Sequence, residues 1–143
     1  MATAEAFVGR EYGPMKYAVG LEKIREYASA TGNQHPWHHD EEAAAEIGGV
    51  IAPPMFIVIP SFKPVLACVQ DAELEIDLAK LVHGEQQYTF HQPIKAGVNL
   101  FTTGVIESVR DKGPMYFVKI RTETEDGDGN GVATGLWNLV IRH

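Results

Sequence analysis

The chain contains one cysteine, Cys68, among its 143 residues, so it cannot form an internal disulfide. This thiol lies in the apolar run 64–69, which favours a buried and unreactive side chain. The chain also has no excess of positive charge, because 12 Lys and Arg stand against 19 Asp and Glu and give a net charge of −7. Since such a surface repels phosphate backbones, we expect no nucleic-acid partner.

A long uninterrupted apolar run is missing as well. The most apolar stretch, 50–69, contains four prolines and Lys63, which favours a buried, interrupted helix over a membrane span. Residues 1–10 lack the basic start and apolar stretch of a signal peptide, so we expect a cytoplasmic protein without a membrane partner. No repeat or low-complexity linker is visible, and the length suits one domain, 1–143.

Apolar residues at helical spacing predict helices in the first half of the chain. The first spans 21–30, and Gly32 is placed to end it in a left-handed turn. A second, short helix is expected to begin at Asp40, because an aspartate can cap free helix amides. Gly48 would close this second helix.

A third helix is predicted to begin near Pro54, where a missing N–H costs little. Its run 55–59 is apolar on all sides, so we expect it to be buried. Pro60 should break or kink the helix, and Ser61 would then cap a continuation to Gln70.

From Val82 the apolar pattern changes to a period of two, which predicts strands. Four strands are expected, over residues 82–91, 98–109, 115–123 and 132–142. His83 and His91 fall in the first of them and are interpreted as surface or edge residues. Short turns favour an antiparallel sheet, and helices followed by strands indicate an α+β domain in which one long helix packs on one curved sheet.

The densest group of titratable side chains lies at residues 35–40, which include three histidines and an aspartate. His35 and His38 flank a proline, and no thiolate or distant acid completes a metal-binding set, so we expect no metal and no cofactor. Histidine titrates near neutrality, which favours an acid–base site over a solvated loop.

Two weaker patterns have simpler interpretations. Residues 126–131 match the first half of a calcium loop, but Trp137 stands where the last acidic ligand is needed, so a hairpin loop is favoured. Five basic residues are candidate phosphate contacts, although ordinary surface positions are the favoured interpretation: Lys63, Lys80, Lys95, Arg110 and Lys112.

The segment from Tyr27 to Phe56 resembles the active-site segment of the MaoC-like hydratases and dehydratases. The likeness rests on Tyr27, the run 32–40 around His38, and the run 48–56; a supporting likeness follows in the Phe-x-x-Pro pattern of 90–97. It implies a hot-dog fold, in which an antiparallel sheet wraps a central helix. It also implies a dimer that converts (3R)-hydroxyacyl and trans-2-enoyl thioesters of CoA or acyl carrier protein.

The resemblance places His38 at the position of the catalytic histidine. Asn33 stands at the position of the catalytic aspartate; it can orient a water but cannot accept a proton at neutral pH. His35 replaces the usual asparagine. Asp40 fits the following acidic position, where capping of the next helix is its favoured role.

The family's His-Gly pair is replaced by Pro53 and Pro54. The glycine normally offers an N–H to the thioester carbonyl, and Pro54 has none. Loss of one such donor typically lowers the rate by about 10²–10³, although the neighbouring amide of Met55 is a substitute. The expected oxyanion and substrate-binding residues are Pro54, Met55, Phe56, His35 and Trp37.

This mixture of features resembles the substrate-binding subgroup of FAS1-like, N-terminal MaoC dehydratase halves, in which a partner subunit or repeat supplies the catalytic pair. The leading hypothesis is therefore a dehydratase or hydratase component that acts with a catalytic MaoC-like partner. The alternatives are a self-sufficient homodimeric enzyme that uses His38, and an acyl-thioester binding module without chemistry.

Overall fold

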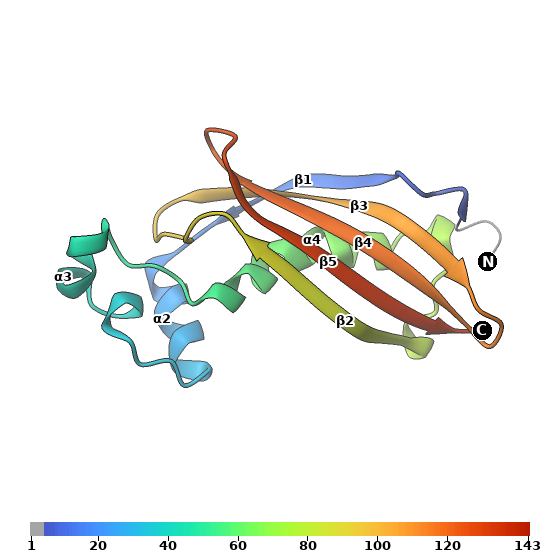
Figure 1. Cartoon of the computed structure of the whole chain (residues 1–143), viewed down its shortest axis with the longest axis horizontal. Coiled ribbons are helices and arrows are strands. Elements are labelled where there is room, and N and C mark those ends of the chain that lie inside the picture. The colour runs from blue at the N-terminus through green and yellow to red at the C-terminus, as the bar shows by residue number, and fades with distance from the viewer. Residues whose placement is uncertain (1–4) are drawn as a thin grey trace.

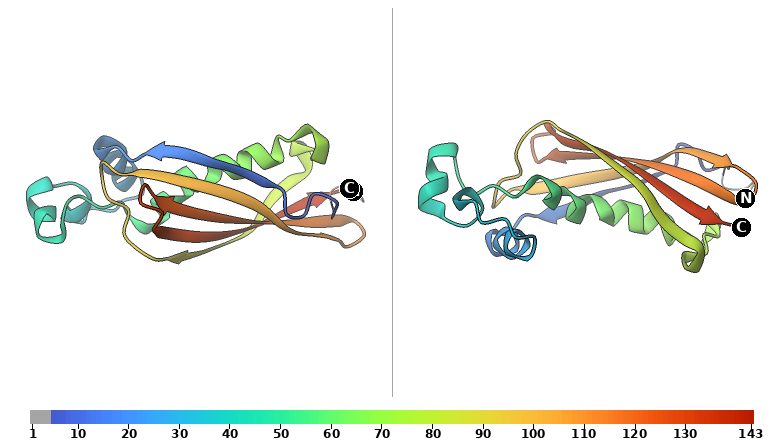
Figure 2. Two further views of the ribbon diagram at one scale, coloured as in Figure 1. Left: turned by 90° about the horizontal axis from the view of Figure 1, so that it is seen from above. Right: turned by 60° about the horizontal axis from the view of Figure 1, so that its bottom comes forward.

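A curved antiparallel sheet forms most of the structure, a computed structural model that describes residues 5–143 (Figure 1). The strands lie in the order β1-β3-β4-β5-β2. Their bounds are Glu11–Ala18 for β1, Leu81–Phe90 for β2, Asn99–Asp111 for β3, Met115–Asp126 for β4 and Gly131–Arg142 for β5. The predicted α+β, hot-dog arrangement is confirmed, since one helix runs along the inner face of this sheet (Figure 2).

That helix is α4, Val58–Val69, which continues directly from a 3₁₀ turn over Pro54–Ile57. Its sheet-facing side carries Val65 and Cys68, which are fully buried. Burial raises the pKa of the Cys68 thiol to about 12, as expected for an unreactive cysteine. Pro64 of α4 packs against Gly104 of β3. A Cβ on that glycine would lie 3.1 Å from Pro64 Cβ. The missing side chain therefore lets helix and sheet approach closely.

The shorter helices gather at one end of the sheet (Figure 1). They are α2, Leu21–Ala30; a 3₁₀ turn, Pro36–His38; and α3, Glu41–Ala44, extended by a 3₁₀ turn, Ala45–Ile47. Two further 3₁₀ turns, Ala72–Leu74 and Leu78–Lys80, connect α4 to β2. Asp40 caps α3 by accepting a hydrogen bond from Glu42 N–H at 2.9 Å, as predicted. None of the helices within residues 5–143 is long and apolar enough to cross a membrane.

Three details differ from the sequence predictions. Strand β1 was not expected; it pairs with β3, which lies far away in the sequence. Pro60 does not break the helix, because it stands in the first turn of α4, where its missing N–H is tolerated. Ser61 is therefore no helix cap, and its hydroxyl instead bonds Ile57 O at 2.6 Å. Met55 is 47 % exposed, so the run 55–59 is not buried on all sides.

Candidate functional site

His38 is the most buried member of the histidine cluster, since it is 8 % exposed, and its ring is hydrogen-bonded to the backbone. Its Nδ1 lies 2.7 Å from Ile51 O, and Ile51 N–H donates in return to Trp37 O at 3.0 Å. Because a carbonyl oxygen can only accept, Nδ1 must carry the proton of this bond. The neutral imidazole therefore has its lone pair on Nε2, which is the atom free to accept a proton.

The segment that receives His38 is itself joined to the loop after β2. Ile51 pairs with Lys95 in an isolated antiparallel bridge, and Ala52 N–H donates to Ile94 O at 2.8 Å. These backbone bonds fix the position of Pro54, which begins the turn before α4, relative to the loop 91–95. Two segments separated by some forty residues thus form one rigid wall around the imidazole.

A cavity of about 420 Å³ lies between these segments. Apolar side chains make up most of its lining, and the polar groups are His38, His91 and Gln92; the remaining lining residues are Ile51, Ala52, Pro54, Phe90, Pro93 and Ile94. The volume and the few convergent polar groups are typical of a small-molecule site.

The second imidazole of the cavity, His91, was interpreted from the sequence as a surface or edge residue. It is exposed, but its surroundings hold it firmly: His91 N–H donates to Val132 O at 2.8 Å, and Nε2 lies 3.2 Å from Thr134 Oγ1. Thr134 donates its single hydroxyl proton to Glu123 Oε2 at 2.7 Å, so it can only accept from the ring. Nε2 of His91 therefore carries the proton, and Nδ1 holds the lone pair of the neutral ring.

Sequence reasoning missed His91 because its two hydrogen-bond partners, Val132 and Thr134, come from β5, and Thr134 is in turn bonded to Glu123 on β4. The one local signal is its place at the end of a predicted strand and ahead of Gln92 and Pro93. Gln92 strengthens the anchoring, since its Nε2 donates to Asp126 Oδ2 at 3.2 Å and to Gly131 O at 3.0 Å.

The other predicted residues of the cluster surround His38 without lining this cavity. Asn33 Oδ1 accepts a hydrogen bond from His35 N–H at 3.3 Å, which makes it part of a turn. The His35 ring accepts from Trp37 N–H through Nδ1 and lies 5.9 Å from the His38 ring, centroid to centroid. Trp37 is half-buried and donates from Nε1 to Glu46 at 3.1 Å.

The predicted oxyanion residues at the start of the central helix separate into two environments. Pro54 lines the cavity, whereas Phe56 is fully buried and packs edge-on against Tyr27, with ring centroids 5.5 Å apart. Met55 stands ahead of the first hydrogen bond of this turn, which runs from Phe56 N–H to Pro53 O at 2.9 Å. Its own N–H has no acceptor within residues 5–143, although Met55 is not among the residues that line the cavity.

An apolar surface lies beside the site, along the outer side of α4 and the edge strand β2. Its large side chains are between 37 % and 59 % exposed: Met55, Phe62, Leu66, Leu78, Val82 and Phe90. A hollow of about 270 Å³ lined by Phe62, Leu66 and Leu78 continues this surface toward Trp137. Within residues 5–143, strand β2 pairs with β5 alone, so its other edge offers unpaired backbone groups.

A helix wrapped by this five-stranded sheet, with a histidine-lined cavity near the helix start, defines a hot-dog fold of the MaoC-like type. The family model described as "FAS1-like, dehydratase domain region" matches residues 6–135. The chain therefore belongs to the FAS1-like dehydratase-region family.

Relatives and solved structures agree with this assignment. The UPF0336 protein of Streptomyces avermitilis is 41 % identical over 145 residues, which cover 99 % of this chain and 97 % of the relative. The UPF0336 protein Rv0504c of Mycobacterium tuberculosis is 32 % identical, with coverage of 96 % and 84 %. Among solved structures, a chain of the HadBC (3R)-hydroxyacyl-ACP dehydratase complex of M. tuberculosis is 29 % identical. It superposes with a TM-score of 0.81 and coverage of 94 % and 96 %.

Proposed function

We propose that this chain is a component of a (3R)-hydroxyacyl-thioester dehydratase or enoyl-thioester hydratase and acts with a MaoC-like partner subunit. The observation that carries the proposal is the largely apolar cavity in which His38 is fixed with its Nε2 lone pair free. The family and the HadBC likeness support the reaction class and the association with a partner.

In this proposal His38 Nε2 moves the proton of the water. In the hydration direction, the water oxygen bonds to C3 of the enoyl thioester, Nε2 accepts the proton that the water releases, and C2 takes up a proton from an acid that the partner subunit supplies. The buried position of the imidazole suits this role, because a fixed base needs no reorganisation. The Met55 amide is the candidate donor to the thioester carbonyl, since Pro54 has no N–H.

A partner subunit would supply what this chain lacks. Asn33 cannot replace a carboxylate as a proton acceptor, and its Oδ1 already accepts from the loop backbone. The apolar surface on α4 and β2 fits a second hot-dog chain, because exposed side chains of this size and an open sheet edge favour protein contact.

Co-expression with a MaoC-like subunit of the same organism, followed by co-purification and crotonyl-thioester hydration assays, tests the proposal. We expect a stable complex whose rate exceeds that of either subunit alone. High activity of this chain alone would reject the need for a partner. No activity in any combination, together with thermal stabilisation by an acyl thioester, would favour the binding module.

A self-sufficient homodimer is the second candidate, and the anchoring of His91 favours it. The cavity is lined by two imidazoles that hydrogen bonds hold in different tautomers. The free lone pair is on Nε2 in His38 and on Nδ1 in His91. One ring can take the proton of the water while the other, protonated, delivers a proton to C2. In this scheme His91 supplies the second proton-transfer group in place of the missing aspartate.

Two substitutions distinguish these candidates. His91→Gln removes the second group, and Thr134→Val keeps the ring but removes the acceptor that sets its tautomer. If the chain works alone, both should lower its turnover and shift its pH profile. His83→Gln is the matched control, because His83 lies on β2, the strand that ends just before His91, but stacks on Trp137. Turnover equal to that of the wild type in all three variants would exclude His91 from the reaction.

A further inference from the structure

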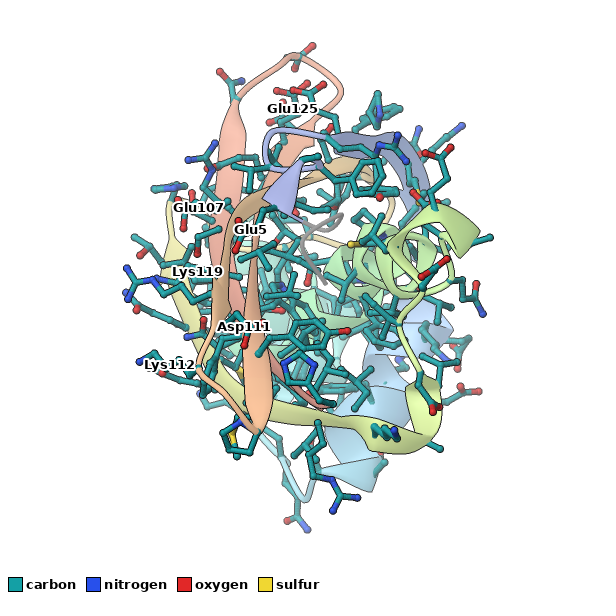
Figure 3. The ribbon with its side chains drawn as sticks, turned by 90° about the vertical axis from the view of Figure 1, so that its right-hand side faces the viewer. Glu5, Glu107, Asp111, Lys112, Lys119 and Glu125 are labelled. Atoms are coloured by element: carbon teal, nitrogen blue, oxygen red, sulfur yellow. The ribbon has the colours of Figure 1, made fainter. Side chains whose placement is uncertain are left out.

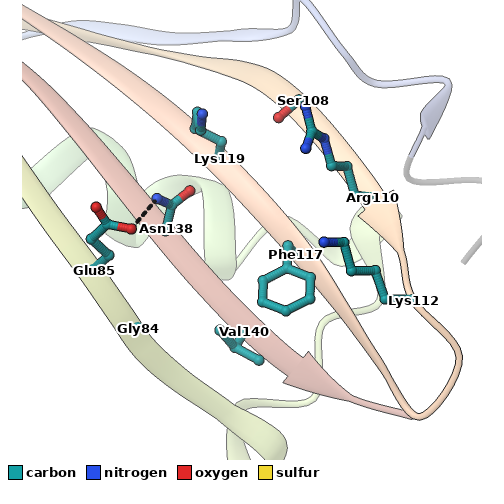
Figure 4. A pocket seen from close by; sticks show the side chains of 9 residues that line it. All are labelled: Gly84, Glu85, Ser108, Arg110, Lys112, Phe117, Lys119, Asn138 and Val140. Carbon is teal, nitrogen blue, oxygen red and sulfur yellow. Dashed lines mark hydrogen bonds between the residues drawn. The ribbon is translucent and has the colours of Figure 1, made fainter.

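A second depression, of about 380 Å³, lies on the outer face of the sheet, which faces away from α4. Figure 4 shows it from close by, with Arg110, Lys112 and Lys119 on one side and Glu85 with Asn138 on the other. Because His38 belongs to the helical end of the molecule, this depression is separate from the site described above. It gathers two of the five basic residues that the sequence marked as candidate phosphate contacts, Arg110 and Lys112.

The three cations have no carboxylate partner within residues 5–143, although the chain has a net charge of −7. The nearby acids are engaged elsewhere. Glu107 pairs with Arg121 at 3.4 Å, and Asp111 accepts from Gly113 N–H and from His143, both at 3.1 Å. Figure 3 shows Lys112 and Lys119 projecting on the side of the sheet that faces away from α4.

The sheet register explains the shape of this site. One row across the strands is polar, with Ser108 paired to Lys119 and Lys119 paired to Asn138. The next row pairs Phe117 with Val140 and forms an apolar floor. Lys112 Nζ lies 5.3 Å above the centre of the Phe117 ring, so this cation is held over the floor.

The one acid that lines the depression stands across from the cations. Glu85 Oε2 accepts a hydrogen bond from Asn138 Nδ2 at 3.2 Å, which fixes both side chains. Gly84 beside it leaves room for Val140, since a Cβ there would lie 2.9 Å from Val140 Cγ2. The depression therefore has positive charge on one side, an apolar floor in the middle and a carboxylate on the other side.

We infer that this outer-face depression binds a nucleotide. Its phosphates would contact Arg110, Lys112 and Lys119, the base would lie over Phe117 and Val140, and an exocyclic amino group would donate to Glu85. A simple anion would use only the cations and would be repelled by the carboxylate. The lining fits a nucleotide whose base carries an exocyclic amino group, and ADP and the nucleotide end of CoA are two ligands with this chemistry.

Amide chemical-shift titrations of the ¹⁵N-labelled full chain with ADP, 3′,5′-ADP and pyrophosphate test the inference. Saturable shifts are expected for ADP or 3′,5′-ADP at residues 108–119 and 138–140. The two nucleotides distinguish a free diphosphate from the CoA end. Arg110→Gln combined with Lys119→Gln should weaken nucleotide binding by at least about tenfold, because two charge-assisted contacts are lost.

The matched control removes two positive charges elsewhere, through Lys63→Gln combined with Lys80→Gln. It should leave the affinity within about twofold at fixed salt. Phe117→Leu should weaken nucleotide binding but leave pyrophosphate binding unchanged. Three results would overturn the inference: no saturable shifts with either nucleotide, equal weakening in the control, or equal affinity for pyrophosphate and ADP. Spectra of the free variants check that each is folded.

Discussion

Two substitutions at His38 separate its chemical role from its structural role. His38→Asn keeps an N–H donor near the position of Nδ1, so the bond to Ile51 O can persist, but it removes the basic Nε2. His38→Ala removes both and leaves the carbonyl oxygen of the partly buried Ile51 without its partner. The pair therefore predicts similar losses of activity and different losses of stability.

The expected magnitudes follow from these contacts. Loss of a general base typically lowers the rate by about 10²–10⁴, and both variants should show this in crotonyl-thioester hydration, measured in the active assembly. A buried acceptor left unpaired costs about 1–3 kcal/mol, so His38→Ala should unfold at lower urea concentration than the wild type. His38→Asn should unfold within about 1 kcal/mol of the wild type if its amide reaches Ile51 O.

The outcome that contradicts this reasoning is near-normal turnover in a folded His38→Asn variant. The proton would then move through another group, and His38 would be a structural clamp. A loss of activity that exactly follows the loss of stability across both variants would lead to the same conclusion. Binding of a non-reactive acyl thioester should survive in both folded variants, since the apolar side chains that make up most of the cavity lining are unchanged.

Three further predictions concern other parts of the chain. Pro54→Gly restores an N–H at the helix start and should raise the hydration rate by up to about 10²-fold; an unchanged rate would indicate that another amide already serves. Gly135→Ala places a Cβ 2.7 Å from an aromatic ring on β2 and should destabilise the fold by about 1–3 kcal/mol in urea denaturation, whereas Gly127→Ala, which meets no neighbour, should not. The Tyr12 hydroxyl, at 2.7 Å, is the main group that lowers the pKa of Asp71. This stabilisation is present above the ordinary aspartate pKa, so the stability gap between wild type and Tyr12→Phe should be full at pH 7 and shrink below about pH 4 in pH-dependent unfolding.

Local patterns predicted most of the fold correctly. The helix at 21–30 has the predicted bounds because apolar spacing and Gly32 act within the segment itself. Strand β1 could not be found in this way, since its sequence contains Gly13 and Pro14 and its pairing with β3 depends on the finished sheet. Pro60 was misjudged because a proline's effect depends on its distance from the helix start, which the sequence does not state.

Only those parts of the candidate site that lie close together in the sequence were predictable. His38, Asp40 and Pro54 lie in one continuous segment, and a recognisable spacing identifies them. His91 acquires its place through Thr134 and Glu123, which lie on two other strands. The exposure of Met55 likewise depends on which side of the helix the sheet leaves uncovered, and that is a property of packing.

The hydrogen bonds around the cavity determine which ring nitrogen of each histidine can accept a proton. The carbonyl of Ile51 and the hydroxyl of Thr134 fix two imidazoles in different tautomers, so the chain has proton acceptors in place. A carboxylate is missing at Asn33 and a glycine amide at Pro54. The Met55 amide is the proposed substitute for the glycine amide, so the group that the proposed partner adds is an acid. If a partner provides this acid, His91 is dispensable; if the chain works alone, we expect His91 to act. Sensitivity of turnover to His91→Gln thus distinguishes a half-site from a complete enzyme.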